Sequence, residues 1–177
     1  MPKTRRFFYT FSHFKRRFKK IDLKLFPFIK LNIIMEIKLF TNQNAKKYIK
    51  KIIKNNTLLE NDFVNRWLDE PRDVKCYILS KKDNIIINII LLSKCDYDPY
   101  KQHKIPHKIP YTLDYIYTFL EYRRNNFAYK MLLYIKNKEE ITAFCSNDES
   151  EHLFKKAEYI FSGYDKMMNV LPVFRYP

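Results

Sequence analysis

The segment Leu113–Lys136, LDYIYTFLEYRRNNFAYKMLLYIK, contains the pattern that decides the fold. Its first eight residues are aliphatic, aromatic or β-branched around a single Asp, which predicts a largely buried strand. A polar stretch, 121–126, follows, and apolar residues then recur at positions i, i+4, i+5 and i+8 from Phe127. This spacing predicts an amphipathic helix. The segment is therefore expected to form a strand, a tight basic turn and a helix.

The turn at 121–126 carries Arg123 and Arg124 directly before the expected helix. The first backbone N–H groups of a helix have no internal partner, and the helix dipole favours negative charge, so such a turn can hold a phosphate. The alternative is a plain strand-to-helix connection whose two Arg side chains are solvated.

This segment resembles the cofactor-binding motif of the GNAT superfamily, the acyl-CoA-dependent N-acetyltransferases. That motif is a strand, then Arg/Gln-x-x-Gly-x-Gly/Ala, then a helix, often with Glu-Tyr before it. Here Glu121-Tyr122 precedes Arg123-Arg124-Asn125-Asn126-Phe127-Ala128, whose first and last positions fit. Asn126 stands where the family usually has Gly. Because Asn adopts positive φ more readily than most residues, we expect the turn to survive this change.

Residues 147–159 are similar to the family's later helix, Asn-x-x-Ala-x-x-Leu-Tyr-x-Lys-x-Gly-Phe. Five positions correspond in kind at the same spacing: Asn147, Ser150, Leu153, Lys156 and Tyr159. Phe154 replaces the Tyr that protonates the leaving CoA thiolate in many members, and Glu158 replaces the Gly. Phe has no proton to give. Two outcomes stay open, an active N-acetyltransferase and a catalytically inactive GNAT-fold binding protein.

The resemblance covers about Glu36 to the C-terminus and implies an α/β (α+β) fold, a twisted mixed sheet flanked by helices. It implies acetyl-CoA as co-substrate and transfer of the acetyl group to a primary amine of a protein or small molecule. The resemblance also implies which residues bind the cofactor. Backbone groups of Ile116, Tyr117 and Thr118 would contact pantetheine, and Asn147 would contact the pantetheine arm. The residues implied around the pyrophosphate are Arg123, Arg124, Asn125, Asn126, Phe127 and Ala128.

Asp114 is the candidate catalytic base that takes a proton from the substrate ammonium. Because it stands among Leu, Tyr and Ile residues, we expect desolvation to raise its pKa. The alternative is an Asp that is solvated or paired with a lysine. Other candidate proton carriers are Tyr115, Tyr117, Tyr122 and Tyr134, although most of the 14 tyrosines are expected to serve packing.

The remaining chain predicts the order β α α β β β α β α β, with an optional last strand. The expected strands outside the central segment are 36–40, 73–81, 85–94 and 140–145. The expected helices are one capped by Thr41 or Asn42, one near 60–68 and one from Ser146 or Asn147 to about Tyr159. Residues 96–111, with three prolines, predict a substrate-shaping loop, and Ser162-Gly163 predicts a turn.

The net charge of +15 is uneven along the 177 residues. Residues 1–34 carry +9 and are rich in Phe and Tyr, whereas residues 35–177 carry +6 and form the expected GNAT-like domain. Three interpretations of 1–34 stay open: a basic arm for nucleic acid, a mitochondrial-type transit peptide, or a disordered extension with Met35 as the working start. No window of about 20 residues lacks charge, so we expect no membrane span.

The three cysteines stand far apart with no C-x-x-C pair, and no secretory signal is evident. We therefore expect a reducing compartment, the cytoplasm first, with a mitochondrial or nuclear location as the alternative. His103 and His107 are four residues apart, but no acidic ligand is near and a proline separates them. We expect an exposed loop there and no metal site.

Overall fold

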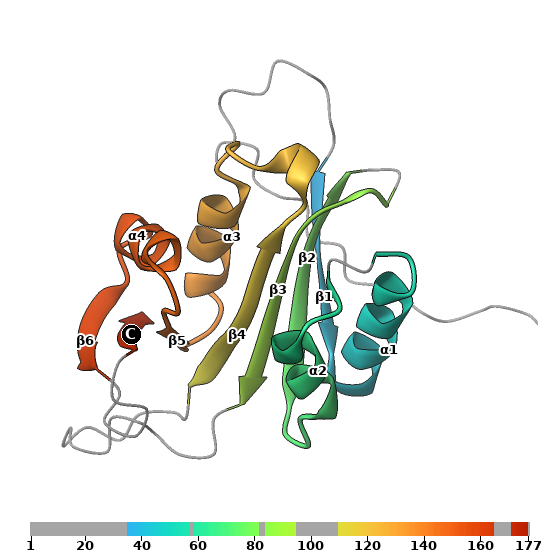
Figure 1. Cartoon of the computed structure of the whole chain (residues 1–177), viewed down its shortest axis with the longest axis horizontal. Coiled ribbons are helices and arrows are strands. Elements are labelled where there is room, and N and C mark those ends of the chain that lie inside the picture. Colours follow the sequence, from blue (N-terminus) through green and yellow to red (C-terminus); the bar gives the residue numbers. More distant parts are fainter. Residues whose placement is uncertain (1–34, 57–58, 82–83, 95–109, 165–170, 177) are drawn as a thin grey trace, which may run out of the picture.

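The computed structural model describes residues 35–56, 59–81, 84–94, 110–164 and 171–176 (Figure 1). These residues form a seven-stranded mixed sheet with helices on both faces, which confirms the predicted fold class. The basic segment 1–34 and most of the loop predicted at 96–111, including His103 and His107, lie outside the described residues.

The elements follow one another in the order that the sequence predicts, and a last strand completes the sheet. The strands are β1 Met35–Thr41, β2 Val74–Lys81, β3 Ile86–Lys94, β4 Tyr111–Thr118, β5 Ile141–Phe144, β6 Ile160–Tyr164 and β7 Pro172–Tyr176. The helices are α1 Asn42–Ile53, α2 Asp62–Asp69, α3 Phe127–Lys136 and α4 Asp148–Lys156, and the 3-10 turn η3 spans Leu120–Tyr122.

The strand order in the sheet is β1-β2-β3-β4-β5-β7-β6. Neighbouring strands are antiparallel except β4 and β5, which run parallel and pair only over 111–113 of β4. In the β3–β4 ladder Leu92 pairs with Leu113 and Leu91 with Tyr115, so Asp114 is the extra residue of a β-bulge. The bulge therefore lies where the pairing of β4 with β5 ends.

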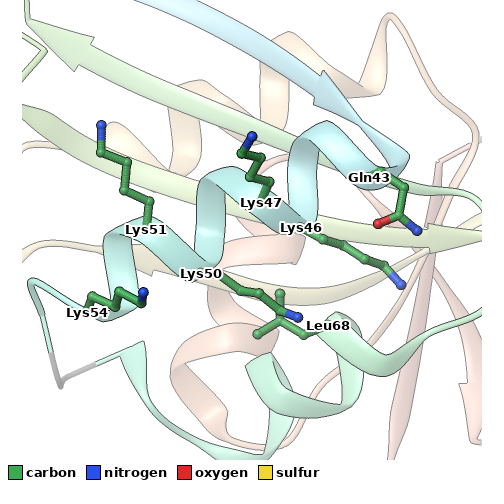
Figure 2. Close-up of a pocket in the computed structure, with 7 residues that line it drawn as sticks. All are labelled: Gln43, Lys46, Lys47, Lys50, Lys51, Lys54 and Leu68. Atoms are coloured by element: carbon green, nitrogen blue, oxygen red, sulfur yellow. The ribbon is translucent and has the colours of Figure 1, made fainter.

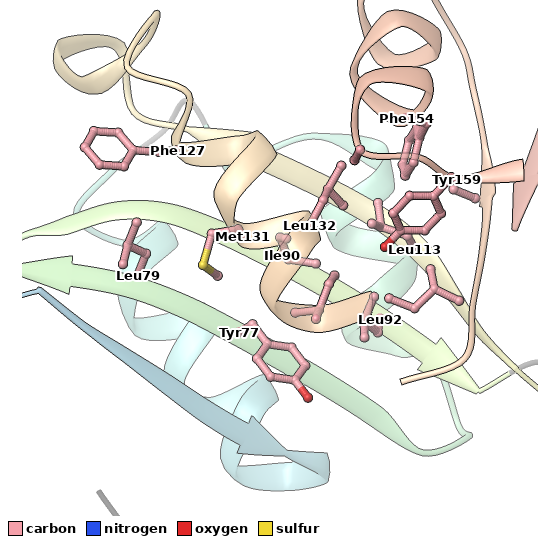
Figure 3. Close-up of a cluster of buried hydrophobic side chains, with 14 of the residues drawn as sticks. Tyr77, Leu79, Ile90, Leu92, Leu113, Phe127, Met131, Leu132, Phe154 and Tyr159 are labelled. Carbon is pink, nitrogen blue, oxygen red and sulfur yellow. The ribbon is translucent and has the colours of Figure 1, made fainter. Parts of the chain in front are cut away.

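The two faces of the sheet carry separate hydrophobic clusters. Helices α1 and α2 cover one face, where Ile49 and Trp67 are buried and Trp67 Nε1 donates to Leu92 O at 2.9 Å. Helices α3 and α4 cover the other face, where Met131 and Phe154 are fully buried (Figure 3). Strands β2 and β3 are buried along almost their whole length, which accounts for their nearly continuous apolar sequences.

One local expectation is wrong, and of the two residues expected to cap α1 the structure selects Thr41. Ser162-Gly163 lies within β6 at an irregularity of its pairing with β7, instead of forming a turn. Gly163 has a φ of +103°, which L side chains rarely adopt, so the irregularity requires Gly. Asn42 does not cap α1, because its Oδ1 accepts from Val74 N–H at 3.1 Å and ties the helix start to β2. Thr41 holds the N-cap position without a side-chain hydrogen bond.

Candidate functional site

The sheet opens between β4 and β5. In the described part of the chain their pairing ends at Leu113 and Ala143, yet β4 continues to Thr118. Along a strand, successive residues direct their backbone groups to opposite edges. Phe119 N–H donates to Ile87 O of β3 at 3.0 Å. The backbone groups of Tyr117 and Tyr115, two and four residues earlier, therefore also face β3.

Tyr117 therefore directs its backbone groups at β3, where it pairs with Ile89, while Ile116 and Thr118 direct theirs into the opening. The bond from Arg123 Nε to Thr118 O, at 3.2 Å, agrees with this orientation. Of the three β4 residues predicted to offer backbone groups, the register leaves Ile116 and Thr118 facing the opening.

The turn after β4 brings the start of α3 to the carboxyl end of the strand (Figure 1). Asn126 is the N-cap of α3 and has φ 59° and ψ 21°, the left-handed conformation that the sequence predicts Asn can supply. Arg124 also has a positive φ, of 60°. Asn125 closes the turn, because its Nδ2 donates to Tyr122 O at 3.3 Å and to Arg123 O at 3.0 Å.

Positive charge gathers around this turn. Arg123 and Arg124 are exposed on it. Lys156 reaches it from α4, with its Nζ 3.1 Å from Asn126 Oδ1. Phe127 and Ala128 begin α3, and the N–H groups of a first helical turn have no acceptor within the helix. The site thus combines backbone donors with three cations, the chemistry that suits a phosphate.

The sequence analysis did not single out Lys156 as a site residue. It matches the Lys of the later helix motif, and that match is the signal that could have identified it. The thirty residues that separate it from Asn126 hide the contact, because only the packing of α4 beside α3 brings the two together.

At the start of α4, Asn147 forms a capping box with Ser150. Its Oδ1 accepts from Ser150 N–H at 2.8 Å, and Ser150 Oγ donates to Asn147 O at 2.7 Å. The cap uses the amide oxygen of Asn147, so its Nδ2 is the group that can serve a ligand. The cap also fixes where α4 begins, and thereby the position of Lys156 two turns later.

Phe154 belongs to the hydrophobic core. It is 1% exposed, stacks on Phe174 at 6.0 Å between ring centroids, and meets Tyr159 edge to face at 5.1 Å (Figure 3). A hydroxyl at this position would enter an apolar environment. The structure therefore gives Phe154 a packing role, in addition to its lack of a transferable proton.

Asp114 lies at the bulge and lines a cavity of about 250 Å³ against α2. The other lining residues are Phe63, Arg66, Trp67, Glu70 and Ser93. Burial raises the pKa of Asp114 to about 6, and Glu70 adds to the rise, while hydrogen bonds from Ser93 and the charge of Arg72 oppose it. Its Oδ2 is buried without a hydrogen-bond partner among the described residues.

Sequence patterns do not predict this cavity, because its other lining residues come from α2, its C-cap and β3, which the chain order does not place beside β4. Glu70 is itself fixed: Arg72 Nε donates to its Oε1 at 2.6 Å, and this bond lowers the pKa of Glu70. Lys46 of α1 donates to Glu70 O. The lining thus holds the carboxyl groups of Glu70 and Asp114 and the guanidinium of Arg66, with Glu70 paired to Arg72.

The four tyrosines considered as proton carriers divide between the two faces of the sheet. Tyr115 and Tyr117 lie on the α2 face, and Asn61 Nδ2 donates to Tyr115 OH at 3.1 Å. Burial raises the pKa of Tyr115 and also that of Tyr134, which packs on the α3 face. Tyr122 packs beneath Lys81, whose Nζ lies 4.6 Å from the ring centroid. Tyr115 is the one that directly follows Asp114 in the chain.

Across the described ranges, no group of three or more His, Cys, Asp or Glu side chains is placed to hold a metal ion. None of the described helices is long and apolar enough to cross a membrane.

Comparisons with known proteins identify the fold. No family model matches the sequence, and no curated protein matches it. Solved structures do match. A GNAT-family acetyltransferase from Listeria monocytogenes matches with a TM-score of 0.53 and 11% identity, over 79% of this chain and 94% of that chain. A GNAT-family acetyltransferase from Streptococcus agalactiae matches with a TM-score of 0.53 and 13% identity, over 81% of this chain and 95% of that chain. AtaT, solved in a complex with acetyl-methionyl-tRNAfMet, matches at 0.53 and 12% over 81% of this chain and 94% of its own. The chain has the GNAT acetyltransferase fold.

Proposed function

We propose that this protein is an N-acetyltransferase that takes the acetyl group of acetyl-CoA and transfers it to a primary amine. The observation that carries the proposal is the arrangement of three features along β4, which we call the path: the basic turn after the strand, the opening beside it and the Asp114 cavity at the bulge. Backbone donors and cations that suit a phosphate lie at one end of this path, and a buried carboxylate lies at the other. The likeness to GNAT structures supports it at the level of the fold.

The path fits an extended ligand with a charged end. The first-turn N–H groups of α3, with Arg123, Arg124 and Lys156, suit the pyrophosphate. Ile116 and Thr118 offer their backbone groups to the pantetheine amides, as a missing strand would. From Thr118 back to Asp114 the strand spans about 13 Å at 3.3 Å per residue, so the thioester end lies near the bulge.

Asp114 supplies the base of the proposed reaction. With a pKa of about 6, it is ionised at neutral pH and is a stronger base than an ordinary Asp. It removes a proton from the substrate ammonium, the amine nitrogen then forms a bond to the thioester carbonyl carbon, and the carbon–sulfur bond breaks to release the thiolate while the nitrogen loses its extra proton to water. Because Phe154 donates no proton, we assign protonation of the thiolate to water.

The cavity indicates which acceptors to screen. The carboxyl group of Asp114, which has an oxygen without a hydrogen-bond partner among the described residues, can accept from an amine, and the cavity volume of about 250 Å³ admits one amine-bearing end and not a large body. Protein N-termini, lysine side chains, polyamines and small amines all satisfy this description. The complex of AtaT with acetyl-methionyl-tRNAfMet adds an amine carried by RNA to the screen.

The test is calorimetric titration of acetyl-CoA and CoA into the full-length chain and into residues 35–177. We expect a Kd in the micromolar range or tighter, about −8 kcal/mol, and acetylation of at least one amine class. Arg123→Glu with Asn126→Glu is expected to abolish binding, because like charge then faces the pyrophosphate. The matched control is Lys138→Glu with Asn137→Glu, which makes the same changes on exposed residues at the far end of α3.

Equal affinity in the site variant and the control would remove the cofactor site from this turn. Tight CoA binding without transfer to any amine class would favour a catalytically inactive GNAT-fold binding protein. A change in affinity on removing residues 1–34 would show that the basic segment contributes to the site.

A further inference from the structure

The exposed side of α1 is lined with lysines. Lys46, Lys47, Lys50, Lys51 and Lys54 follow one another at spacings of one and three residues, and we call them the α1 lysine face. With Leu68 of α2 they line a groove of about 580 Å³ (Figure 2). Figure 2 shows Lys47 and Lys51 on one side of the helix and Lys50 beside Leu68.

Nothing in α1 balances this charge. The helix contains no acidic residue. Among the described residues, the ion pairs formed by lysines involve Lys38, Lys75, Lys136 and Lys155, and none involves the α1 lysine face. Like charges at i and i+4, such as Lys46 with Lys50, destabilise a helix. Among the described residues, Lys46 is the one member of this face whose side chain has a hydrogen bond inside the protein, to Glu70 O, so the other lysines are available to an external anion.

The spacing of the lysines fits a regular polyanion. Lys46, Lys50 and Lys54 lie on one row of the helix and span about 12 Å at 1.5 Å per residue. The row places one lysine about every 6 Å, from four residues at 1.5 Å each, so it can meet three phosphates of a strand, one for each lysine. Lysine is a point charge without the planar geometry that reads base edges, so the contacts are to the backbone and independent of sequence.

Other partners fit this surface less well. A helix that lies in a membrane surface needs an exposed apolar side, but the apolar residues Ala45 and Ile49 of α1 are buried against the sheet. Protein interfaces are enriched in aromatic residues and depleted of Lys at their centre. The groove is recessed between two helices and short, so it accepts a single strand more readily than a duplex. Single-stranded stretches are characteristic of RNA.

We infer that the α1 lysine face binds the phosphate backbone of single-stranded RNA. This surface is distinct from the basic turn before α3, and it goes beyond the proposed acetyl transfer. Lys46 also connects it to the Asp114 cavity, because Lys46 Nζ donates to Glu70 O and Glu70 lines that cavity. An RNA on α1 therefore lies next to the cavity proposed for the acceptor.

The test uses the full-length chain and a fluorescein-labelled 12-nucleotide oligouridylate, with anisotropy measured at several salt concentrations. The test variant is Lys50→Glu with Lys54→Glu. The control is Lys138→Glu with Lys155→Glu, two exposed lysines on the α3 and α4 side. Both doubles lower the net charge by four, and the control also removes the Lys155–Glu151 ion pair, so any effect of the control is an upper limit for charge removal away from α1. Lys50→Gln with Lys54→Gln replaces the test variant if the Glu double does not fold.

We expect the test variant to bind at least tenfold more weakly and the control to stay within twofold of the wild type. The slope of log K against log salt should fall by about 1.4, which is 0.7 for each lost contact to a single strand. Equal weakening in both doubles, or none in either, would overturn the inference. So would α1-dependent binding of duplex DNA or of phosphatidylserine vesicles together with no binding of the oligouridylate.

Acetyl-CoA titration of the same proteins keeps the two proposals apart. We expect the Lys50/Lys54 variant to bind acetyl-CoA as the wild type does. RNA binding that depends on α1, in a protein that does not bind acetyl-CoA, would leave this inference standing and remove the proposed function.

Discussion

Replacing Asp114 with Asn removes the buried carboxyl at the bulge and keeps its size. The pKa of Asp114 is raised from 3.8 to about 6, so the folded state holds this proton more tightly than the unfolded chain. The resulting stabilisation is complete below the unfolded pKa of 3.8 and is lost as the pH rises through 6. At 1.36 kcal/mol per pH unit, a difference of about two units corresponds to about 3 kcal/mol.

The assay is urea unfolding of the wild type and Asp114→Asn at pH 4.5 and at pH 7.5. Between pH 4.5 and pH 7.5, the free energy of unfolding of the Asn variant relative to that of the wild type should increase by about 2 kcal/mol. This is less than the full change of about 3 kcal/mol, because part of the change occurs below pH 4.5. Asp69→Asn is the control, since it removes an exposed carboxylate of α2, and it should keep the wild-type behaviour between the two pH values. A difference that does not change with pH would refute the burial argument.

Activity gives the same residue a second test. If Asp114 is the base, kcat/KM of the wild type should rise tenfold per pH unit below about pH 6 and level off above it. Asp114→Asn should lose this rise together with most of the rate. An unchanged profile in the variant would assign proton removal to another group.

Substitutions at three further positions test the site. Asn126→Gly should tighten acetyl-CoA binding, measured by calorimetry, because Gly adopts the φ of 59° freely and has no side chain to obstruct the pyrophosphate. Asn126→Ala should lower the free energy of unfolding in urea by about 1 kcal/mol, because Ala does not adopt this φ freely. Phe154→Tyr should lower the free energy of unfolding by about 1–3 kcal/mol, because it buries a hydroxyl, without raising the transfer rate; a faster, equally stable variant would contradict the packing role. Asn147→Ala should cost about 1 kcal/mol through loss of the cap, and unchanged stability in urea would show that the capping box contributes nothing.

Local patterns in the sequence predict most of the fold. The periodicity of residues 113–136 predicts β4 and α3, and the residue type at position 126 predicts a left-handed turn. These features depend on near neighbours in the chain, which sequence patterns report directly. The cap at Asn147 is predicted for the same reason, since a capping box spans only four residues.

Features that depend on strand register or on distant elements could not be predicted. The bulge at Asp114 exists because β3 and β4 are offset by one residue, and no local pattern specifies that offset. Gly163 was placed in a turn because Gly favours turns, but it occupies an irregular position of β6 instead. The cavity around Asp114 combines α2, β3 and β4, which only the folded sheet brings together.

The short parallel ladder between β4 and β5 also has a consequence for the lifetime of the protein. The ladder joins strands β1–β4 to strands β5–β7 through three residue pairs. The contact between these two parts of the sheet therefore depends largely on the side-chain packing beneath α3 and α4. A ligand that forms hydrogen bonds to both β4 and β5 would link the two parts of the sheet. At a concentration of one hundred times Kd, such a ligand adds about 2.7 kcal/mol to the folded state. If that ligand is acetyl-CoA, as proposed, resistance of the protein to proteolysis would rise and fall with the acetyl-CoA concentration.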